Sequence, residues 1–295
     1  MRSRIQLQPI MIAVALMAAS SAAWPASPLP SGDKLLLTGG VTQVEGAAGG
    51  GLTPWAVIGG YGTRDQIGGN AFYTRVEIDD YALDSYGALV GLYDRVELSI
   101  ARQSFNTQNV GALLGLGQDF KFRQDIYGVK VKLFGDIVYD QDSWLPQVSV
   151  GLQHKRNDQG AVVRAVGAKD DKGTDYYVTA TKLFLARSTL VNATVRATRA
   201  NQIGILGFGG DRNDDYEAQF EGSVAYLLTR NLAIGAEYRT KPDNLGIAKE
   251  DDWKDIFIAW APTKNVSLTA AYVDLGNIVI RDDQKAFYIS AQIGF

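Results

Sequence analysis

The chain ends in Ala286-Phe287-Tyr288-Ile289-Ser290-Ala291-Gln292-Ile293-Gly294-Phe295, a run in which two kinds of side chain alternate. Successive side chains of a β-strand point to opposite faces of the sheet, so this run predicts a strand with two different faces. The apolar face consists of Phe287, Ile289, Ala291, Ile293 and Phe295. The other face is small or polar. In a membrane barrel the apolar face contacts lipid, and the small or polar face lines the lumen.

The same period of two recurs earlier in the chain. It is clear in residues 266–272, 232–239, 147–153, 127–133 and 96–100, whereas 174–185 alternate less cleanly and their facing stays open. Short and long connections follow one another between these segments. The long ones lie near 105–123, 156–173, 200–215, 241–250 and 275–284. This alternation is typical of outer-membrane barrels, which have short periplasmic turns and longer outer loops.

Beyond the N-terminus, no stretch approaches the roughly 18 apolar residues of a spanning helix, so a membrane-spanning chain must close into a barrel. We therefore predict an all-β fold, a single transmembrane antiparallel β-barrel within residues 34–295. Its strand count is 12 or 14, because 34–62 either adds a hairpin or forms a separate Gly-rich plug. Both counts are even, as in bacterial single-chain barrels. A soluble periplasmic β-sandwich is the alternative fold.

The N-terminus predicts export. Arg2 and Arg4 precede an uncharged apolar run over 10–19, and Ser21-Ala22-Ala23 offers the small residues that a signal peptidase needs. We expect residues 1–23 to be a cleaved secretory signal peptide and 24–33 a short linker. A membrane anchor is the alternative, but the apolar run is too short to span a bilayer comfortably.

The terminal run resembles the C-terminal signature of bacterial outer-membrane β-barrels, including porins, in which a final aromatic residue follows apolar residues at alternating positions. The resemblance implies that the barrel-assembly machinery of the outer membrane reads the apolar face of this strand. Ile293 departs from the pattern, since an aromatic residue is frequent there. Residues 39–55, GGVTQVEGAAGGGLTPW, also resemble an uncharacterised proteobacterial family catalogued as a domain of unknown function. That resemblance implies a shared fold and brings no activity or ligand with it.

Charged residues within the predicted strands are expected to face the lumen. Arg or Lys facing lipid at the midplane of the bilayer costs about 2–4 kcal/mol. The predicted lumen residues are Arg75, Glu77, Glu97, Lys130, Lys132, Arg196, Glu217, Glu221, Glu237 and Arg239. They either pair and close the lumen or line a water-filled channel with weak charge preference.

The sequence offers little for catalysis. It contains no cysteine, which excludes disulfides, thiolate metal sites and a cysteine nucleophile. The single histidine, His154, is predicted to point outward, and Arg156 stands where phospholipase barrels of this class place a serine. Gly49-Gly50-Gly51 is not a phosphate loop, because no Gly-Lys-Ser or Gly-Lys-Thr follows it. We expect no catalytic residue and no cofactor.

Acidic pairs recur in the predicted outer loops and at the outer strand ends. They are Asp79-Asp80, Asp170-Asp171, Asp214-Asp215, Asp251-Asp252 and Asp282-Asp283. Solvated loops favour such residues, and this is the simpler interpretation. The sharper hypothesis is an acidic rim that binds divalent cations and bridges them to lipopolysaccharide, because hard cations prefer carboxylate oxygens. Whether a metal binds is left open.

Two predicted outer loops are unusually apolar. Residues 110–117 and 203–208 must bury their side chains, either against each other as a lid or by folding into the lumen toward an apolar solute. Aromatic residues near strand ends are expected to anchor the barrel in the headgroup zone. These are Trp55, Trp144, Trp253, Trp260, Tyr93 and Tyr226.

These patterns predict a monomeric porin-like channel or passive transporter for small solutes in the bacterial outer membrane. The alternatives are a structural or interaction barrel with a blocked lumen and, third, an outer-membrane hydrolase. The expected partners are outer-membrane lipid and lipopolysaccharide, the barrel-assembly machinery and small solutes. A net charge of -3 gives no reason to expect nucleic acid.

Overall fold

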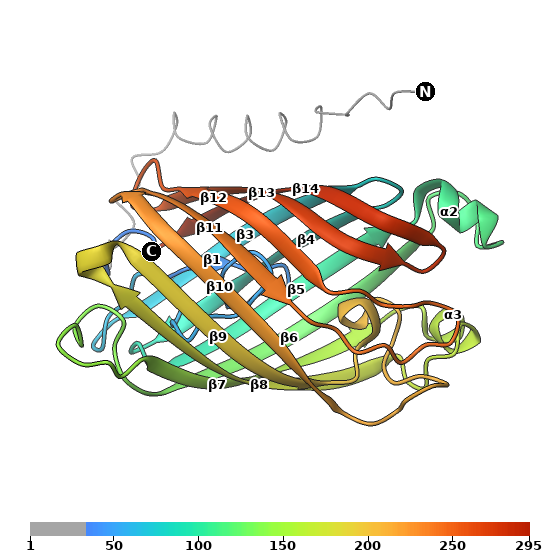
Figure 1. Cartoon of the computed structure of the whole chain (residues 1–295), viewed down its shortest axis with the longest axis horizontal. Coiled ribbons are helices and arrows are strands. Elements are labelled where there is room, and N and C mark those ends of the chain that lie inside the picture. Colours follow the sequence, from blue (N-terminus) through green and yellow to red (C-terminus); the bar gives the residue numbers. More distant parts are fainter. Residues whose placement is uncertain (1–33) are drawn as a thin grey trace. The chain divides into compact units, whose positions relative to one another are not determined.

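A computed structural model describes residues 34–295, and the predicted signal peptide and linker lie outside this range. Twelve antiparallel strands form a closed barrel, as predicted (Figure 1). The strands are β3 (Ile67–Ile78), β4 (Ala82–Leu92), β5 (Val96–Asn106), β6 (Lys121–Phe134), β7 (Gln147–Asn157), β8 (Lys172–Phe184), β9 (Thr189–Thr198), β10 (Glu217–Thr229), β11 (Leu232–Arg239), β12 (Trp253–Trp260), β13 (Val266–Ile278) and β14 (Arg281–Gly294). Pairing of β14 with β3 closes the ring.

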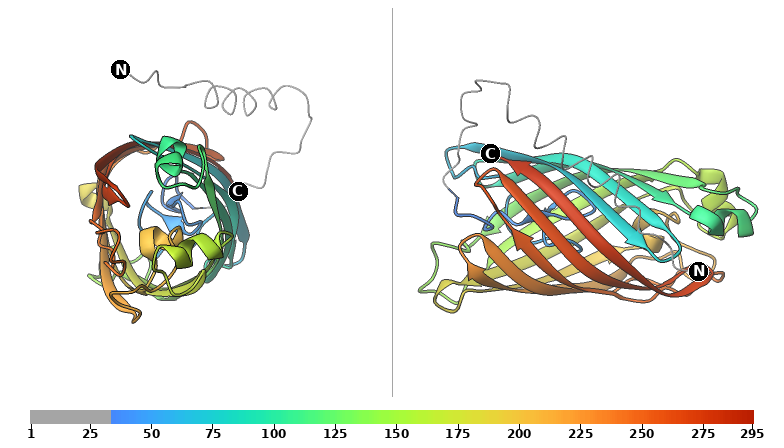
Figure 2. Two further views of the ribbon diagram at one scale, coloured as in Figure 1. Left: turned by 90° about the vertical axis from the view of Figure 1, so that its right-hand side faces the viewer. Right: turned by 90° about the horizontal axis from the view of Figure 1, so that it is seen from above.

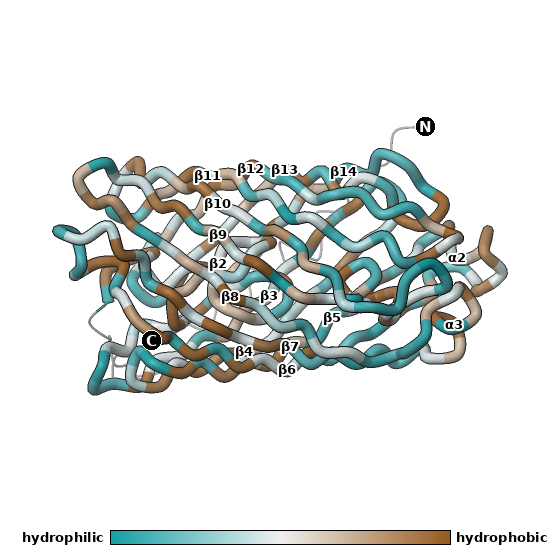
Figure 3. Tube along the Cα trace, turned by 60° about the horizontal axis from the view of Figure 1, so that its bottom comes forward, coloured by the Kyte–Doolittle hydropathy of each residue, from teal (hydrophilic) through white to brown (hydrophobic). Residues whose placement is uncertain are grey.

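The final strand has the two faces that its sequence predicts. Phe287 is 59% exposed and Ile289 37%, whereas Tyr288 is 1% exposed and Ser290 4%. The apolar side chains therefore point outward and the others point into the barrel. Coloured by hydropathy, the barrel concentrates its hydrophilic residues toward the end that carries the two helices (Figure 3).

The connections distinguish the two ends of the barrel. At one end, here the short-turn end, lie the turn at 93–95, the 3₁₀ turn η2 (Leu185–Arg187) and the longer connection 135–146. At the other, the long-loop end, connections hold α2 (Gln108–Leu113), α3 (Gly160–Ala165) and the 3₁₀ segment η3 (Asn201–Gly204). None of the helices within residues 34–295 is long and apolar enough to cross a membrane. The prediction of a long loop at 275–284 is wrong. The strands β13 and β14 continue through most of this region, with bulges around Gly276.

The strand count is 12 because residues 34–62 lie inside the barrel and add no strand to its wall (Figure 2, left). We call this segment the plug. Its regular structure is one short ladder between β1 (Val41–Thr42) and β2 (Ala48–Gly49). Every residue from 38 to 62 is buried. Frequent glycines allow the tight turns, as at Gly40, whose φ of 72° is unfavourable for other residues.

The plug leaves the barrel next to the C-terminus. The carbonyl oxygen of Phe295 accepts hydrogen bonds from the Tyr61 amide at 2.9 Å and from the Gly69 amide at 3.0 Å. The beginning of the described chain, the seam of the barrel and its last residue therefore meet at the short-turn end.

Candidate functional site: the occupied lumen

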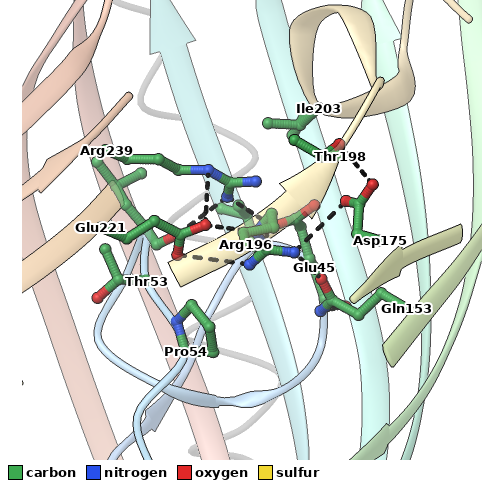
Figure 4. A network of polar contacts seen from close by, with 12 residues as sticks. Glu45, Thr53, Pro54, Gln153, Asp175, Arg196, Thr198, Ile203, Glu221 and Arg239 are labelled. Atoms are coloured by element: carbon green, nitrogen blue, oxygen red, sulfur yellow. Dashed lines mark hydrogen bonds and ion pairs between the residues drawn. The ribbon is translucent and has the colours of Figure 1, made fainter. Parts of the chain in front are cut away.

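The tip of the plug carries Glu45, which is buried among three cations of the barrel wall. Figure 4 shows two of them, Arg196 and Arg239. Its carboxylate pairs with Arg239 at 2.5 Å, with Arg196 at 3.8 Å and with Lys155. Two wall carboxylates complete the cluster: Asp175 lies 2.6 Å from the Lys155 ammonium, and Glu221 pairs with Arg196. We call the six residues the latch: Glu45, Lys155, Asp175, Arg196, Glu221 and Arg239.

The latch balances three positive charges against three carboxylates, one of which comes from the plug. Burial alone would raise the pKa of Glu45, but the charges of Arg239, Lys155 and Arg196 outweigh it and hold the pKa well below its usual range. Because the folded pKa is depressed, the stabilisation is complete above the ordinary carboxyl value of about 4.3 and is lost only in stronger acid. Without Glu45, the wall would bury three cations against two anions.

Another wall carboxylate, Glu237, binds the turn of the plug. It accepts hydrogen bonds from the Leu52 amide at 2.8 Å and from the Thr53 hydroxyl at 2.5 Å. Ser223 joins the same group, since its hydroxyl donates to Glu237 at 2.9 Å and accepts from the Trp55 indole at 3.0 Å. The plug passes so close at Gly50 that any side chain there would collide with Glu237. A side chain at this position would push the Glu237 carboxylate away from its bonds with the plug.

The opposite wall holds the plug at a third site, a buried pair of Glu97 and Lys130. Glu97 accepts from the amides of Ala48 at 3.1 Å and Gly59 at 2.8 Å. Lys130 lies 3.0 Å from Glu97 and donates to the Ala48 carbonyl at 2.9 Å. Both side chains are 1% exposed. Charged wall residues thus satisfy backbone groups of the plug that would otherwise be buried without partners.

Neutral side chains make most of the remaining contacts. Thr179, Asn192 and Thr194 all donate to the Pro54 carbonyl. Gln147 and Ser149 both donate to the Ala56 carbonyl at 2.6 Å. Water can replace bonds of this kind, and each contributes about 0.5–1.5 kcal/mol net. The wall therefore suits both an occupied and a hydrated lumen.

The loop after β9 covers the plug from the long-loop end. Ile203, Ile205 and Leu206 are buried, and the Ile203 carbonyl accepts from Lys155 of the latch at 3.1 Å. Of the two apolar loops, 203–208 thus folds into the lumen, whereas α2 in the other loop leaves Leu113 65% exposed.

Loop 240–252 fixes this inward loop through a buried pair. Glu250 accepts from the Gln202 amide at 2.7 Å and lies 3.4 Å from the Lys241 ammonium. Burial lowers the pKa of Lys241 and raises the pKa of Glu250, although each charge partly offsets the effect on the other. The end of the lumen toward the long loops is therefore closed by contacts between loops.

Eight of the ten predicted lumen residues face inward, and two do not. The eight are Glu97, Lys130, Lys132, Arg196, Glu217, Glu221, Glu237 and Arg239. All but two of them belong to the latch or to the other two plug-binding sites. Lys132 pairs with Asp94 and Asp136 toward the short-turn end, and Glu217 accepts from Asn213 at the long-loop end.

The lumen assignment of Arg75 and Glu77 is wrong, because both lie on the outer face of β3 near its long-loop end. Arg75 is 2.7 Å from Glu77 and 2.7 Å from Asp84 on β4. The neighbouring inward positions of β3 are taken by Thr74 and Val76. Two carboxylates compensate the arginine, and its place near the strand end keeps it away from the bilayer midplane, so the cost that favoured an inward position does not apply.

Sequence reasoning missed three members of the site. Glu45 lies in the Gly-rich segment, which has no period to assign a facing. Asp175 lies in the stretch whose facing stayed open. Lys155 could have been found from the sequence, because it lies two residues after Gln153 and therefore on the same, inward face of the strand.

A family model described as "Protein of unknown function (DUF3034)" matches residues 38–292. The chain belongs to this family. The match includes most of the plug as well as the barrel, so the lumen contacts fall within the region that defines DUF3034. No curated relative matches the chain.

Similar solved structures include two porins and an outer membrane phospholipase. The KdgM porin in complex with disordered oligogalacturonate is 11% identical, with a TM-score of 0.50, and the match covers 77% of this chain and 99% of that one. The NanC porin is 10% identical, with a TM-score of 0.50 and coverage of 76% and 98%. Outer membrane phospholipase A from Escherichia coli is 11% identical, with coverage of 76% and 92% and a TM-score of 0.45, too low to support an argument about activity. The likeness to the two porins, together with the closed ring of twelve strands, shows that the chain has a porin-like barrel fold.

The remaining predicted sites are divided between the surface of the DUF3034 barrel, its ends and its interior. His154 points outward, with Nδ1 2.9 Å from the Thr174 hydroxyl. Trp144 and Trp260 are exposed. Trp55 and Trp253 are buried inside the barrel, so the assignment of these two residues as interface anchors is wrong. Trp55 belongs to the plug, and Trp253 faces inward at the start of β12, where the Lys241 ammonium lies 4.7 Å from its ring.

The acidic pairs all lie in the connections or strand ends at the long-loop end. Several bind cations of the protein itself: Asp170 and Asp214 each lie 2.7 Å from Arg199. Within residues 34–295, no three Asp, Glu or His side chains are grouped so as to hold a metal ion. A rim cation would therefore need further ligands, such as lipid phosphates.

The cation-binding rim stays a prediction. In calorimetric titration with calcium, an Asp282→Asn/Asp283→Asn variant should bind less than the wild-type protein if the rim binds calcium. Equal heats for the two proteins would remove the hypothesis.

Proposed function

We propose that this DUF3034 protein is a solute-passage barrel of the bacterial outer membrane that is kept shut by its own N-terminal plug. Its action is binding and exclusion, without bond making. The observation that carries the proposal is the lining of the lumen, where charged and neutral polar side chains bind the plug through contacts that water can also make. The apolar outer face and porin-like fold support a place in the outer membrane, with the long loops outside. Lipid, lipopolysaccharide and the barrel-assembly machinery are then its proposed partners.

Displacement of the plug is the step that would open the barrel. The plug enters from the short-turn end and is held by the latch at its tip and by Glu237 at its turn. Once the plug leaves, wall charges such as Lys155 and Arg239 would face water, which solvates them. Loss of one latch contact should therefore favour the open form.

Conductance across planar bilayers tests this proposal. Wild-type protein should be mostly closed, and Glu45→Ala should raise the open probability about 100-fold or more. Removing one partner of a buried ion pair costs about 3–5 kcal/mol, and each 1.4 kcal/mol is tenfold in an equilibrium.

An engineered disulfide supplies the matched control. The hydroxyl oxygens of Thr53 and Ser223 lie 2.6 Å apart, and the chain has no cysteine of its own. Thr53→Cys and Ser223→Cys added to Glu45→Ala should abolish the conductance when oxidised and restore it on reduction. The Thr53→Cys single variant should not respond to oxidation.

A structural or interaction barrel with a blocked lumen is the second candidate, because residues 38–62 of the plug are all buried inside the barrel. It predicts that a folded barrel lacking residues 34–62 conducts no better than the wild type. Folding of each variant is checked by its heat-dependent mobility on a gel.

A further inference from the structure

The part of the lumen between the plug and the outer loops is apolar along one side. Inward positions of β3, β4, β5, β13 and β14 toward the long-loop end carry hydrocarbon side chains. They include Val76, Ile78, Leu83, Phe105, Val273 and Leu275. The interior of a water-filled barrel is polar. This sector therefore does not resemble a wall for hydrated ions, and it faces the charged latch sector across the barrel.

Two enclosed cavities lie along this apolar sector. The inner cavity, about 40 Å³, has Val44 and Leu52 of the plug on one side and Ile205 and Leu206 of the inward loop on another. The outer cavity, about 30 Å³, lies beneath the long loops and is lined by hydrocarbon side chains such as Leu116 and Ile247. Phe105, Leu206 and Val279 border both cavities. These three side chains thus separate two parts of one apolar path from the loops to the plug.

The inner cavity is also lined by a residue whose hydrogen-bond donor lacks an acceptor. Trp253 lines it and is 6% exposed. Within residues 34–295, the Trp253 indole nitrogen is buried without a hydrogen-bond partner. Buried Trp and Tyr side chains usually find a partner, and leaving one unpaired costs about 1–3 kcal/mol. A molecule with an acceptor oxygen would relieve that cost.

The loop that separates the cavities is strained. Gln202 and Ile203 have positive φ values of 43° and 58°. Such a conformation is unusual for a β-branched residue and costs about 1–3 kcal/mol. The contacts of Glu250 with the Gln202 amide and of Lys155 with the Ile203 carbonyl hold it in place. Gln124 also donates to the Ile203 carbonyl at 3.2 Å, and Lys241 donates to the Gln202 side chain at 3.1 Å. Because contacts with other elements keep the loop in this strained conformation, loss of those contacts would let the loop move when a molecule enters beside Leu206.

We propose that the two cavities join, on displacement of Leu206, into a binding site for an uncharged and mainly hydrocarbon molecule with one acceptor oxygen, such as an aromatic ketone. Each cavity alone is smaller than the roughly 150 Å³ that holds benzene in a protein interior. Charged solutes are disfavoured, because burying a charge without a partner is costly. The inference names the solute class of the proposed function and rests on it for the direction of transport, while binding itself can be tested separately.

Fluorine NMR of the full barrel labelled with 5-fluorotryptophan tests the site, with acetophenone as the probe. Trp253 lines the inner cavity, whereas Trp144 and Trp260 are exposed on the outside at 85% and 45% and report partition into the surrounding lipid. Trp253→Phe assigns the resonance. Acetophenone should shift the Trp253 resonance until the site is saturated. Any shift of the Trp144 and Trp260 resonances should grow with the acetophenone concentration and reach no plateau.

Matched variants and a second probe define the outcomes. Leu206→Trp fills the path and should abolish the Trp253 shift, whereas Leu206→Ala joins the cavities and should strengthen binding. Ethylbenzene, which has the same shape without the oxygen, should bind roughly fivefold more weakly, as expected for one lost hydrogen bond. A Trp253 resonance that does not move in either the wild type or Leu206→Ala overturns the proposal, as does an equal shift in Leu206→Trp. Binding without conductance in any plug variant would instead overturn the proposed passage function and leave the site standing.

Discussion

Glu45→Ala is expected to lower the free energy of unfolding by about 3–5 kcal/mol, the usual cost of removing one partner from a buried ion pair. Glu45 is fully buried and pairs with Lys155, Arg196 and Arg239, so its loss leaves three cations facing two carboxylates. The pKa of Glu45 is held below its usual range, so the full effect should be present at neutral pH. Equilibrium unfolding in urea, monitored by tryptophan fluorescence, measures it.

Glu77→Ala is the matched control for this experiment. Glu77 also pairs with an arginine, but it lies on the outer face and its side chain is 31% exposed. Ion pairs at the protein surface contribute about 0–1 kcal/mol to the free energy of unfolding. If both variants lose the same stability, the latch does not hold the plug in the way described here.

Phe208→Ala is expected to lower the free energy of local opening of the inward loop by about 3–5 kcal/mol. Large-to-small changes at buried aromatic residues have effects of this size. The side chain is 0% exposed and lies against Gly173 and Gly204. Its amide donates to the Asp170 carbonyl at 2.8 Å, which ties the inward loop to the loop that carries α3. Faster hydrogen exchange of the amides in 199–210 would report the opening.

Leu113→Ala is the control in that case, because Leu113 in α2 is 65% exposed. Exchange in 199–210 should be unchanged by this substitution. Unchanged exchange in Phe208→Ala as well would mean that the inward loop is held by its polar contacts alone, through Gln202 and Ile203.

The strands were predictable because lipid and lumen impose opposite demands on alternate residues. In β14 this gave the facing of Phe287 and Tyr288 directly from the sequence. The same reasoning failed for Arg75, since it assumed a position deep in the bilayer. The arginine lies near a strand end, opposite Asp84, and cross-strand pairing of this kind depends on a register that one strand alone does not reveal.

The plug was less predictable for a different physical reason. A segment rich in glycine has no hydrophobic period, and its partners come from strands far away in sequence. Glu45 meets Lys155, Arg196 and Arg239 only after the ring has formed, so no local pattern marks it. The sequence left open whether 34–62 is a hairpin or a plug, and the contacts with the wall decide between them.

The meeting of Phe295 with Tyr61 and Gly69 has a consequence for biogenesis. The joint between β14 and β3 lies beside the place where the plug leaves the lumen, so closure of the ring also forms the contact that holds this end of the plug. A finished ring would offer only its narrow ends for entry, whereas an unfinished sheet is open along its whole length. We therefore expect the sheet to close around the plug during folding, because this route avoids threading the plug through one end of a finished ring.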